Sequence, residues 1–269
     1  MLETSHPAHG VTSLSWTVPA DGRLSWIPPE RTGFDPQNIH LVDGQDRLLM
    51  VDTGMPIHLD AIVDAVEAIR GGRRLVVFLT RIELECLSNL PGLLGRMDNV
   101  EVATAVPLSP WDLVHLPRAE LATTVRVTHL AFGGTLGEVG FPAIRILRPP
   151  VNTLSTSWLH DGASGALFSS DFFAADIAPD AATPAMRIDG DGLPDPDTIG
   201  RTVLHKFDWL ARARREPLAA AYDALFCDVA PTALCPTHGR IASGSQLCAR
   251  IVDDHRQALF ARRVATQAA

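Results

Sequence analysis

Short apolar runs separated by turn-forming residues dominate the first part of the chain. Residues 39–42 and 48–51 are apolar and are joined by an Asp-Gly-Gln-Asp segment, which predicts a hairpin of two buried strands. Over residues 59–69 the apolar positions recur at helical spacing, and Gly71 predicts the end of that helix. Residues 75–79 form a continuous apolar run, typical of a strand that is buried on both faces. This succession indicates an α/β fold with helices covering a sheet.

The rest of the chain continues the alternation. Helical stretches are predicted over residues 198–229, with an interruption near Pro217, and over residues 245–264, with a strand at 233–235 between them. Residues 174–199 are rich in Asp and Pro, which predicts an irregular surface loop or lid. Further strands are predicted at residues 99–106, 125–130, 143–147 and 166–169.

Composition narrows the class of protein. The chain has 269 residues, of which 46% are hydrophobic, and no linker or repeat divides it, so we predict one domain over residues 1–269. Its formal net charge is −8 and the acidic residues are dispersed, which argues against a nucleic-acid partner. The N-terminus resembles no targeting signal and no apolar run is long enough to span a membrane, so we expect no membrane partner. Lys206 is the only lysine, which we attribute to coding bias.

The cysteines indicate the compartment. Four cysteines occur and none forms a C-x-x-C pair, which is far below the density of a disulfide scaffold. A reducing cytoplasm is therefore the expected location. Cys227, Cys235 and Cys248 are expected in the core, whereas Cys86 stands beside Glu85 after a predicted strand.

Chemically reactive side chains follow three of the predicted strands. The strand at 75–79 leads into a block that contains Glu83, Glu85 and Cys86, and two later strands lead into Asp171 and His238. In an open α/β sheet such strand ends face one crevice, where ligands bind. No phosphate-binding glycine motif and no G-x-S-x-G elbow occurs in the chain. Three carboxylates, a thiol and an imidazole are therefore expected to meet at one point.

At these residues the sequence resembles the metallo-β-lactamase fold superfamily, and within it most the flavodiiron and oxygen-binding diiron group. Glu83 stands at the third position of that group's H-x-E-x-D-H motif. The resemblance implies a four-layer αβ/βα sandwich, favours a homodimer, and assigns the Asp-x-Gly turn at Asp52 a structural role. It covers about residues 36–245 and rests on the segments 38–42, 49–54, 80–92, 167–173 and 236–239.

The first metal site of the family would use the positions of Arg81, Glu83, Asn152 and Asp171. An arginine side chain only donates hydrogen bonds and offers no lone pair to a metal. This degenerate first site is therefore expected to hold no ion. A guanidinium at this position is expected to pair with Glu83 and Asp171, because neighbouring carboxylates need a compensating positive charge.

The second metal site of the family would use Glu85, Cys86, Asp171 and His238. Two oxygens, a thiolate and an imidazole nitrogen are competent ligands for Zn or Fe(II). We expect at most one such ion per chain, or none. The remaining histidines that the resemblance leaves unplaced, His129, His160 and His205, are expected in surface or packing roles.

Three functions follow from this site. The first is a metal-dependent oxidoreductase with one ion at the second site; because no flavodoxin domain lies within these 269 residues, it would need a separate electron donor. The second is a metal-free scaffold that binds a ligand or partner, with Arg81 replacing a metal. The third is a single-zinc hydrolase of an ester or thioester. All three leave the small-molecule substrate or ligand open, because the fold hosts many activities.

Overall fold

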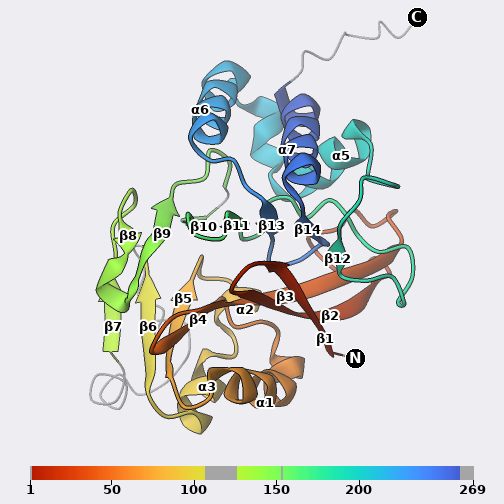
Figure 1. The fold of residues 1–269 in the computed structure, drawn as a ribbon. Coiled ribbons are helices and arrows are strands. Elements are labelled where there is room, and N and C mark those ends of the chain that lie inside the picture. The colour runs from red at the N-terminus through yellow and green to blue at the C-terminus, as the bar shows by residue number, and fades with distance from the viewer. Residues whose placement is uncertain (1, 107–125, 153, 261–269) are drawn as a thin grey trace, which may run out of the picture.

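Two β-sheets pack face to face, and helices cover both outer sides (Figure 1). The computed structural model describes residues 2–106, 126–152 and 154–260. Helices α1 and α3 lie against the first sheet, and α5, α6 and α7 lie against the second. These four layers confirm the predicted αβ/βα sandwich.

The first sheet has the strand order β1-β2-β3-β4-β5-β6-β7 within the described residues. Its strands pair antiparallel from β1 to β4 and parallel from β4 to β7. Parallel pairing brings the carboxyl ends of β4, β5 and β6 to one edge of this sheet. The bounds are β1 Leu2–Ala8, β2 Val11–Ala20, β3 Gly33–Asp43, β4 Arg47–Val51, β5 Arg74–Leu79, β6 Val100–Thr104 and β7 Arg126–His129.

The second sheet has the order β12-β14-β13-β11-β10-β9-β8. Its central strands β11 and β13 are parallel, with Phe168 opposite Cys235. The segments that follow these two strands therefore leave the sheet side by side. The bounds are β8 Thr135–Leu136, β9 Phe141–Leu147, β10 Trp158–Asp161, β11 Ala166–Phe168, β12 Met186–Arg187, β13 Ala233–Cys235 and β14 Ile241–Ser243.

Apolar side chains fill all three spaces between the layers. Phe78 and Phe168 belong to the cluster between the two sheets, whereas Ile62 and Val66 of α1 pack against the outer face of the first sheet. The α-helices in the described residues are α1 Leu59–Arg70, α2 Leu84–Leu87, α3 Leu90–Arg96, α5 Pro196–Lys206, α6 Arg215–Asp228 and α7 Ser245–Phe260. The 3-10 helices are η1 Pro56–His58, η3 Gly137–Val139 and η4 Asp208–Arg212.

Most predicted elements are confirmed. The hairpin is β3–β4, the first helix is α1, and Gly71 ends α1 in the left-handed conformation with φ 56°. The two predicted helical stretches are α5 and α6, but the break between these α-helices lies over residues 207–214, a few residues before Pro217. Pro217 itself lies in the first turn of α6, where its missing N–H has no intrahelical partner to lose. The region 174–199 also contains β12 and the start of α5.

Some predicted ends lie outside the described residues. The last helix is described to Phe260, so the predicted continuation to 264 is not covered. Residue 125, the predicted start of β7, is not covered either. No helix in the described residues is long and apolar enough to cross a membrane.

Candidate functional site

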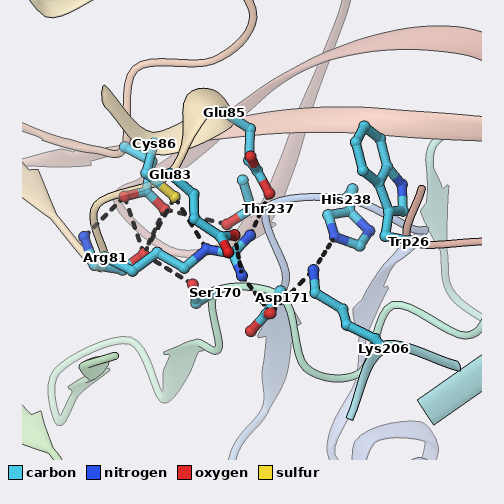
Figure 2. A network of polar contacts seen from close by, with 12 residues as sticks. Trp26, Arg81, Glu83, Glu85, Cys86, Ser170, Asp171, Lys206, Thr237 and His238 are labelled. Carbon is cyan, nitrogen blue, oxygen red and sulfur yellow. Dashed lines mark hydrogen bonds and ion pairs between the residues drawn. The ribbon is translucent and has the colours of Figure 1, made fainter. Parts of the chain in front are cut away.

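The side chains expected to share a site come together at the ends of strands from both sheets (Figure 2). Arg81 follows β5, and Glu85 and Cys86 lie on the short helix α2 directly after it. Asp171 and His238 follow β11 and β13. Because these two strands are parallel neighbours, the sheet itself brings the carboxylate and the imidazole to one edge.

Arg81 is at the centre of a polar cluster, and its side chain is only 2% exposed. The cluster consists of Arg81, Glu83, Glu85, Cys86, Asp171 and His238. The guanidinium forms ion pairs with Glu83 at 2.8 Å and, at shorter range, with Glu85 and Asp171. Its Nε also donates to Sγ of Cys86 at 3.5 Å. Burial opposes the charge on Arg81, but the neighbouring anions, Asp171 above all, hold its pKa well above the ordinary value. The expected pairing of Arg81 with Glu83 and Asp171 is confirmed.

A second cation, Lys206 at the end of α5, lies on the other side of Asp171. Its Nζ donates to Asp171 Oδ2 at 2.9 Å and to His238 Nε2 at 3.1 Å. Asp171 Oδ2 therefore contacts both Arg81 and Lys206. The sequence offered one signal for this residue, since Lys206 is the only lysine among many arginines, and attributing it to coding bias overlooked its role.

These contacts set the protonation of Asp171 and His238. Burial raises the pKa of Asp171, but Arg81 and Lys206 outweigh this effect and hold the pKa well below its usual range. Burial, together with Lys206, lowers the pKa of His238 well below its usual value, so the imidazole is neutral at pH 7. Because Nε2 accepts from the ammonium group, the proton of His238 resides on Nδ1. This Nδ1 is buried and has no hydrogen-bond partner among the described residues.

A second layer of hydrogen bonds lies beneath the cluster and centres on Asp52. Its carboxylate accepts from the backbone N–H of Thr80 at 2.8 Å and from the hydroxyls of Thr80 and Thr237. Thr80 Oγ1 also lies 2.9 Å from Ser170 Oγ. Asp52 thereby ties together the ends of β4, β5 and β13, as its expected structural role requires. Burial raises its pKa to about 6.

Trp26 and Asp35 also belong to the site, although no sequence pattern predicts their presence there. The ring of Trp26 lies 5.1 Å from that of His238, centroid to centroid, and Trp26 Nε1 donates to Asp35 at 2.8 Å. Asp35 is fully buried and also accepts from Gln37 Nε2 and from the backbone N–H of Gly239. Burial raises its pKa to about 7. No motif marks either residue: Asp35 is on β3, and Trp26 is in the loop between β2 and β3.

Among the described residues, Asn152 forms no hydrogen bond with this cluster. Its side-chain amide donates to the carbonyl of Pro149 within its own loop, and no hydrogen bond in the described part of the chain joins it to Arg81 or Asp171. Cys227, expected in the core, is exposed on α6, whereas Cys235 and Cys248 are buried as expected. His205 lies on the surface as expected, and its Nε2 contacts the carbonyl of Ser25 at 3.1 Å.

An open cleft of about 460 Å³ lies above the cluster. Its polar lining includes Glu83, which is 32% exposed, and Glu85, which is 8% exposed. Leu84 projects at its rim and is 69% exposed. The cluster can therefore be reached from solvent on one side. The lining residues are Ser25, Trp26, Met55, Glu83, Leu84, Glu85, His205 and Lys206.

The donor groups of the cluster do not fit a metal ion in this arrangement. All three carboxylates face Arg81, whose charge is permanent, and Lys206 Nζ lies between Asp171 and His238. Burial raises the pKa of Cys86 well above its usual value, which favours the thiol over the metal-binding thiolate. Across the described ranges, no three His, Cys, Asp or Glu side chains are placed to hold an ion. A metal would first have to displace one of the two cations.

Comparisons with known proteins show which solved structures share this fold. No protein-family model matches the chain, and no curated protein matches its sequence. Rubredoxin oxygen:oxidoreductase from Desulfovibrio gigas is similar in structure with a TM-score of 0.67 and 16% identity, over 95% of this chain and 61% of that one. A metal-soaked Flv1 flavodiiron core from Synechocystis sp. PCC6803 matches with a TM-score of 0.64 and 14% identity, over 96% and 60%. A metallo-β-lactamase from Hirschia baltica matches with a TM-score of 0.54 and 13% identity, over 94% and 97%.

The chain therefore has the metallo-β-lactamase fold and resembles flavodiiron proteins within it. It spans about 60% of the length of these two flavodiiron structures. Identities of this size establish the fold, and the function has to be argued from the site itself.

Proposed function

We propose that this chain is a metal-independent protein of the metallo-β-lactamase fold that binds a small molecule in the cleft above Arg81 and Lys206. The observation that carries the proposal is the position of Asp171, whose Oδ2 contacts both cations. In the family that the sequence resembles, the aspartate at this position bridges two metal ions. In this chain a guanidinium and an ammonium group contact Asp171 instead.

Electrostatics gives a reason for this replacement. Buried carboxylates are stable as anions only when positive charge and hydrogen bonds compensate for their lost hydration. Arg81 contacts all three carboxylates of the cluster, and Lys206 contacts Asp171 a second time. Two organic cations thus supply, without any ion uptake, the charge that metals would supply.

The cleft supplies the space for a ligand. Its apolar side is formed by Trp26, Met55 and Leu84, and its polar side includes Glu83 and Lys206. A cleft of this volume with apolar walls and a few polar groups is typical of small-molecule sites. Such a ligand would contact the surface of the cluster without entering it.

The competing function is a one-metal oxidoreductase with Fe or Zn at Glu85, Cys86, Asp171 and His238. It requires Lys206 to leave its place between Asp171 and His238 and would need a separate electron donor. A single-zinc hydrolase of an ester or thioester has the same requirement at Lys206. A homodimer is compatible with each of these functions.

Elemental analysis separates the functions. We expect protein purified without chelator, and then exposed to Fe(II) or Zn, to hold no stoichiometric metal. The double variant Arg81→His with Asn152→His should bind more metal than the wild type, and so should Lys206→Met, because each removes one cation. Arg212→Gln, at an exposed arginine outside the site, is the control. One iron per wild-type chain would favour the oxidoreductase, and one zinc the hydrolase.

Ligand binding is tested separately. Wild-type protein is incubated with a metabolite extract and washed, and the small molecules released on denaturation are identified by mass spectrometry. Leu84→Arg should block the cleft and abolish retention of the bound compound. Ile57→Arg is the matched control, because Ile57 is similarly exposed, at 77%, but does not line the cleft. Equal retention by both variants would contradict binding at this cleft.

A further inference from the structure

Two arginines line a second cleft, which is distinct from the site above. Arg31 lies in a turn after β2, closed by its N–H donating to the carbonyl of Pro28, and Arg201 lies on α5. Both guanidinium-bearing side chains line a cleft of about 560 Å³. Its lining residues are Pro28, Glu30, Arg31, Thr32, Thr198, Arg201 and Thr202.

Neither arginine has an ion-pair partner in the described part of the chain. The buried arginines Arg70, Arg81 and Arg187 each form an ion pair with a carboxylate at 2.8 Å or less. Arg31 is half-buried, yet it donates only to the hydroxyl of Thr202, at 2.9 Å, and no described carboxylate lies within 4.0 Å of it. Its Nε and Nη2 are left without a described hydrogen-bond partner.

Arg201, like Arg31, has a threonine hydroxyl as its side-chain partner and no described ion pair. Its Nη2 donates to the hydroxyl of Thr198 at 3.3 Å, and it too lacks a described carboxylate within 4.0 Å. Burial lowers the pKa of Arg31; the charges of Asp176 and Asp35, which lie beyond ion-pair distance, oppose this, and the charge of Arg201 adds to it. The cleft therefore brings two like charges together without a direct anionic partner.

The carboxylates near the cleft do not supply that partner. Asp195 accepts a hydrogen bond from the backbone N–H of Thr198 at 2.7 Å and so caps the start of α5. Glu30 lines the cleft, but its side chain is exposed to solvent and makes no ion pair among the described residues. The capped helix start is satisfied, so the attraction for an anion comes from the two guanidinium groups.

We propose that this cleft binds the phosphate group of a small molecule. Guanidinium groups match phosphate oxygens with paired, charge-assisted hydrogen bonds, and threonine hydroxyls add further donors. Thr32 and Thr198 lie in the lining beside the arginines. The volume of the cleft exceeds what one inorganic phosphate fills, which leaves room for an organic part.

The site also has a structural link to the first cleft. The bond from Arg31 to Thr202 joins the segment that carries Trp26 to the helix that carries Lys206. Thr202 and Lys206 are one helical turn apart on α5. The bound phosphate would therefore hold together two elements that line the first cleft, although its binding does not depend on the function proposed for that cleft.

Isothermal titration calorimetry at constant ionic strength tests the proposal with two probes, inorganic phosphate and O-phosphoserine. We expect saturable one-to-one binding to the wild type. Binding should weaken by at least about tenfold in Arg201→Gln and in Arg31→Gln, since a charge-assisted bidentate contact contributes more than 1.4 kcal/mol, the equivalent of that factor. Arg201 is exposed, so its variant is expected to fold even if Arg31→Gln does not.

Two further variants sharpen the test. Glu30→Gln removes a negative charge from the lining and should tighten phosphate binding severalfold. Arg212→Gln, at an exposed arginine away from the cleft, should leave it unchanged. Tighter binding of O-phosphoserine would assign the cleft to an organic phosphate, and equal binding to the phosphate group alone. No saturable binding of either probe to the wild type, or equal binding by Arg201→Gln, would overturn the proposal.

Discussion

Arg81 and Lys206 contact the same carboxylate, that of Asp171, from opposite sides. The site therefore has an Arg81 half and a Lys206 half, and the two halves are built differently. Arg81 finds two of its three carboxylates, Glu83 and Glu85, within four residues of itself along the chain. The polar contacts of the Lys206 ammonium group within the described residues are with Asp171 and His238, both far away in sequence. The first half is therefore visible as a local motif, whereas the second exists only once α5 has packed beside the second sheet.

The two cations also differ in chemistry. A guanidinium is always charged and can contact several carboxylates at once, as Arg81 does. An ammonium group is a point charge with three hydrogens, and Lys206 uses two of them, one on a carboxylate and one on a neutral imidazole. Removing Arg81 should consequently destabilise the protein more than removing Lys206.

Arg81→Ala is expected to produce the largest effect. It leaves Glu85 and Asp171 buried without their main counter-ion, and breaking such a buried pair typically costs about 3–5 kcal/mol. Urea unfolding at pH 7 measures the loss, and Arg81→Lys, which keeps the charge but not the forked geometry, should lose less. A loss below about 1 kcal/mol, the range of exposed ion pairs, would contradict the role of Arg81 as an internal counter-ion.

The same variant has an expected pH dependence. The pKa of Asp171 is held below its usual range, so its ionised form contributes stability at pH values above the ordinary carboxyl pKa. That contribution is lost as the pH falls through the lowered value. The difference in stability between wild type and Arg81→Ala should therefore be full at pH 7 and shrink progressively below about pH 4. A difference that stays constant down to pH 3 would contradict this assignment.

Lys206→Met is expected to have the next largest effect. It removes one charge-assisted hydrogen bond from Asp171, and such bonds contribute about 1.5–3 kcal/mol. The loss should be smaller than for Arg81→Ala because Asp171 keeps its contact with Arg81. Lys206→Arg keeps the positive charge and serves as the control in the same unfolding experiment. If Lys206→Met lowered the free energy of unfolding as much as Arg81→Ala does, Lys206 would be as important a counter-ion of Asp171 as Arg81.

Asp35 is expected to make the free energy of unfolding depend on pH in the opposite direction from Asp171. Its folded pKa is raised to about 7, so the stability that it contributes is fully present below the unfolded carboxyl pKa and is lost as the pH rises towards 7. The wild type should therefore lose stability relative to Asp35→Asn, by about 2 kcal/mol between pH 5 and pH 7, given at most 1.4 kcal/mol per pH unit for one proton. Urea unfolding of both proteins at pH 5, 6, 7 and 8 measures this difference. A difference that does not change with pH would mean that Asp35 is ionised throughout.

The smallest effect is expected at Asn152. Its side chain donates only to the carbonyl of Pro149 and is half-buried in a loop. Asn152→Ala should therefore change the free energy of unfolding by less than about 0.5 kcal/mol, as is usual for substitutions away from packed or charged features. A loss comparable to that of Lys206→Met would show that Asn152 supports the cluster after all.

Much of the architecture was predictable because it depends on short-range patterns. Short stretches of sequence predict the apolar runs of β4 and β5, the helical spacing of α1 and the left-handed Gly71. The break between α5 and α6 was misplaced because a proline marks a helix end only when it follows the first turn, and Pro217 lies within that turn.

The sequence by itself determined the fold and the identity of the Arg81 half of the site. Arg81, Glu83 and Glu85 are close along the chain, and the parallel strands before Asp171 and His238 make their meeting a consequence of sheet topology. Only the tertiary structure decided what neutralises the other side of Asp171. Lys206, Trp26 and Asp35 come from a helix end and from the first strands and loop, and no local period or spacing encodes which of them faces His238. Their positions follow from the packing of α5 and the N-terminal segment against the strand ends, a long-range arrangement in which buried charge must find its counter-charge.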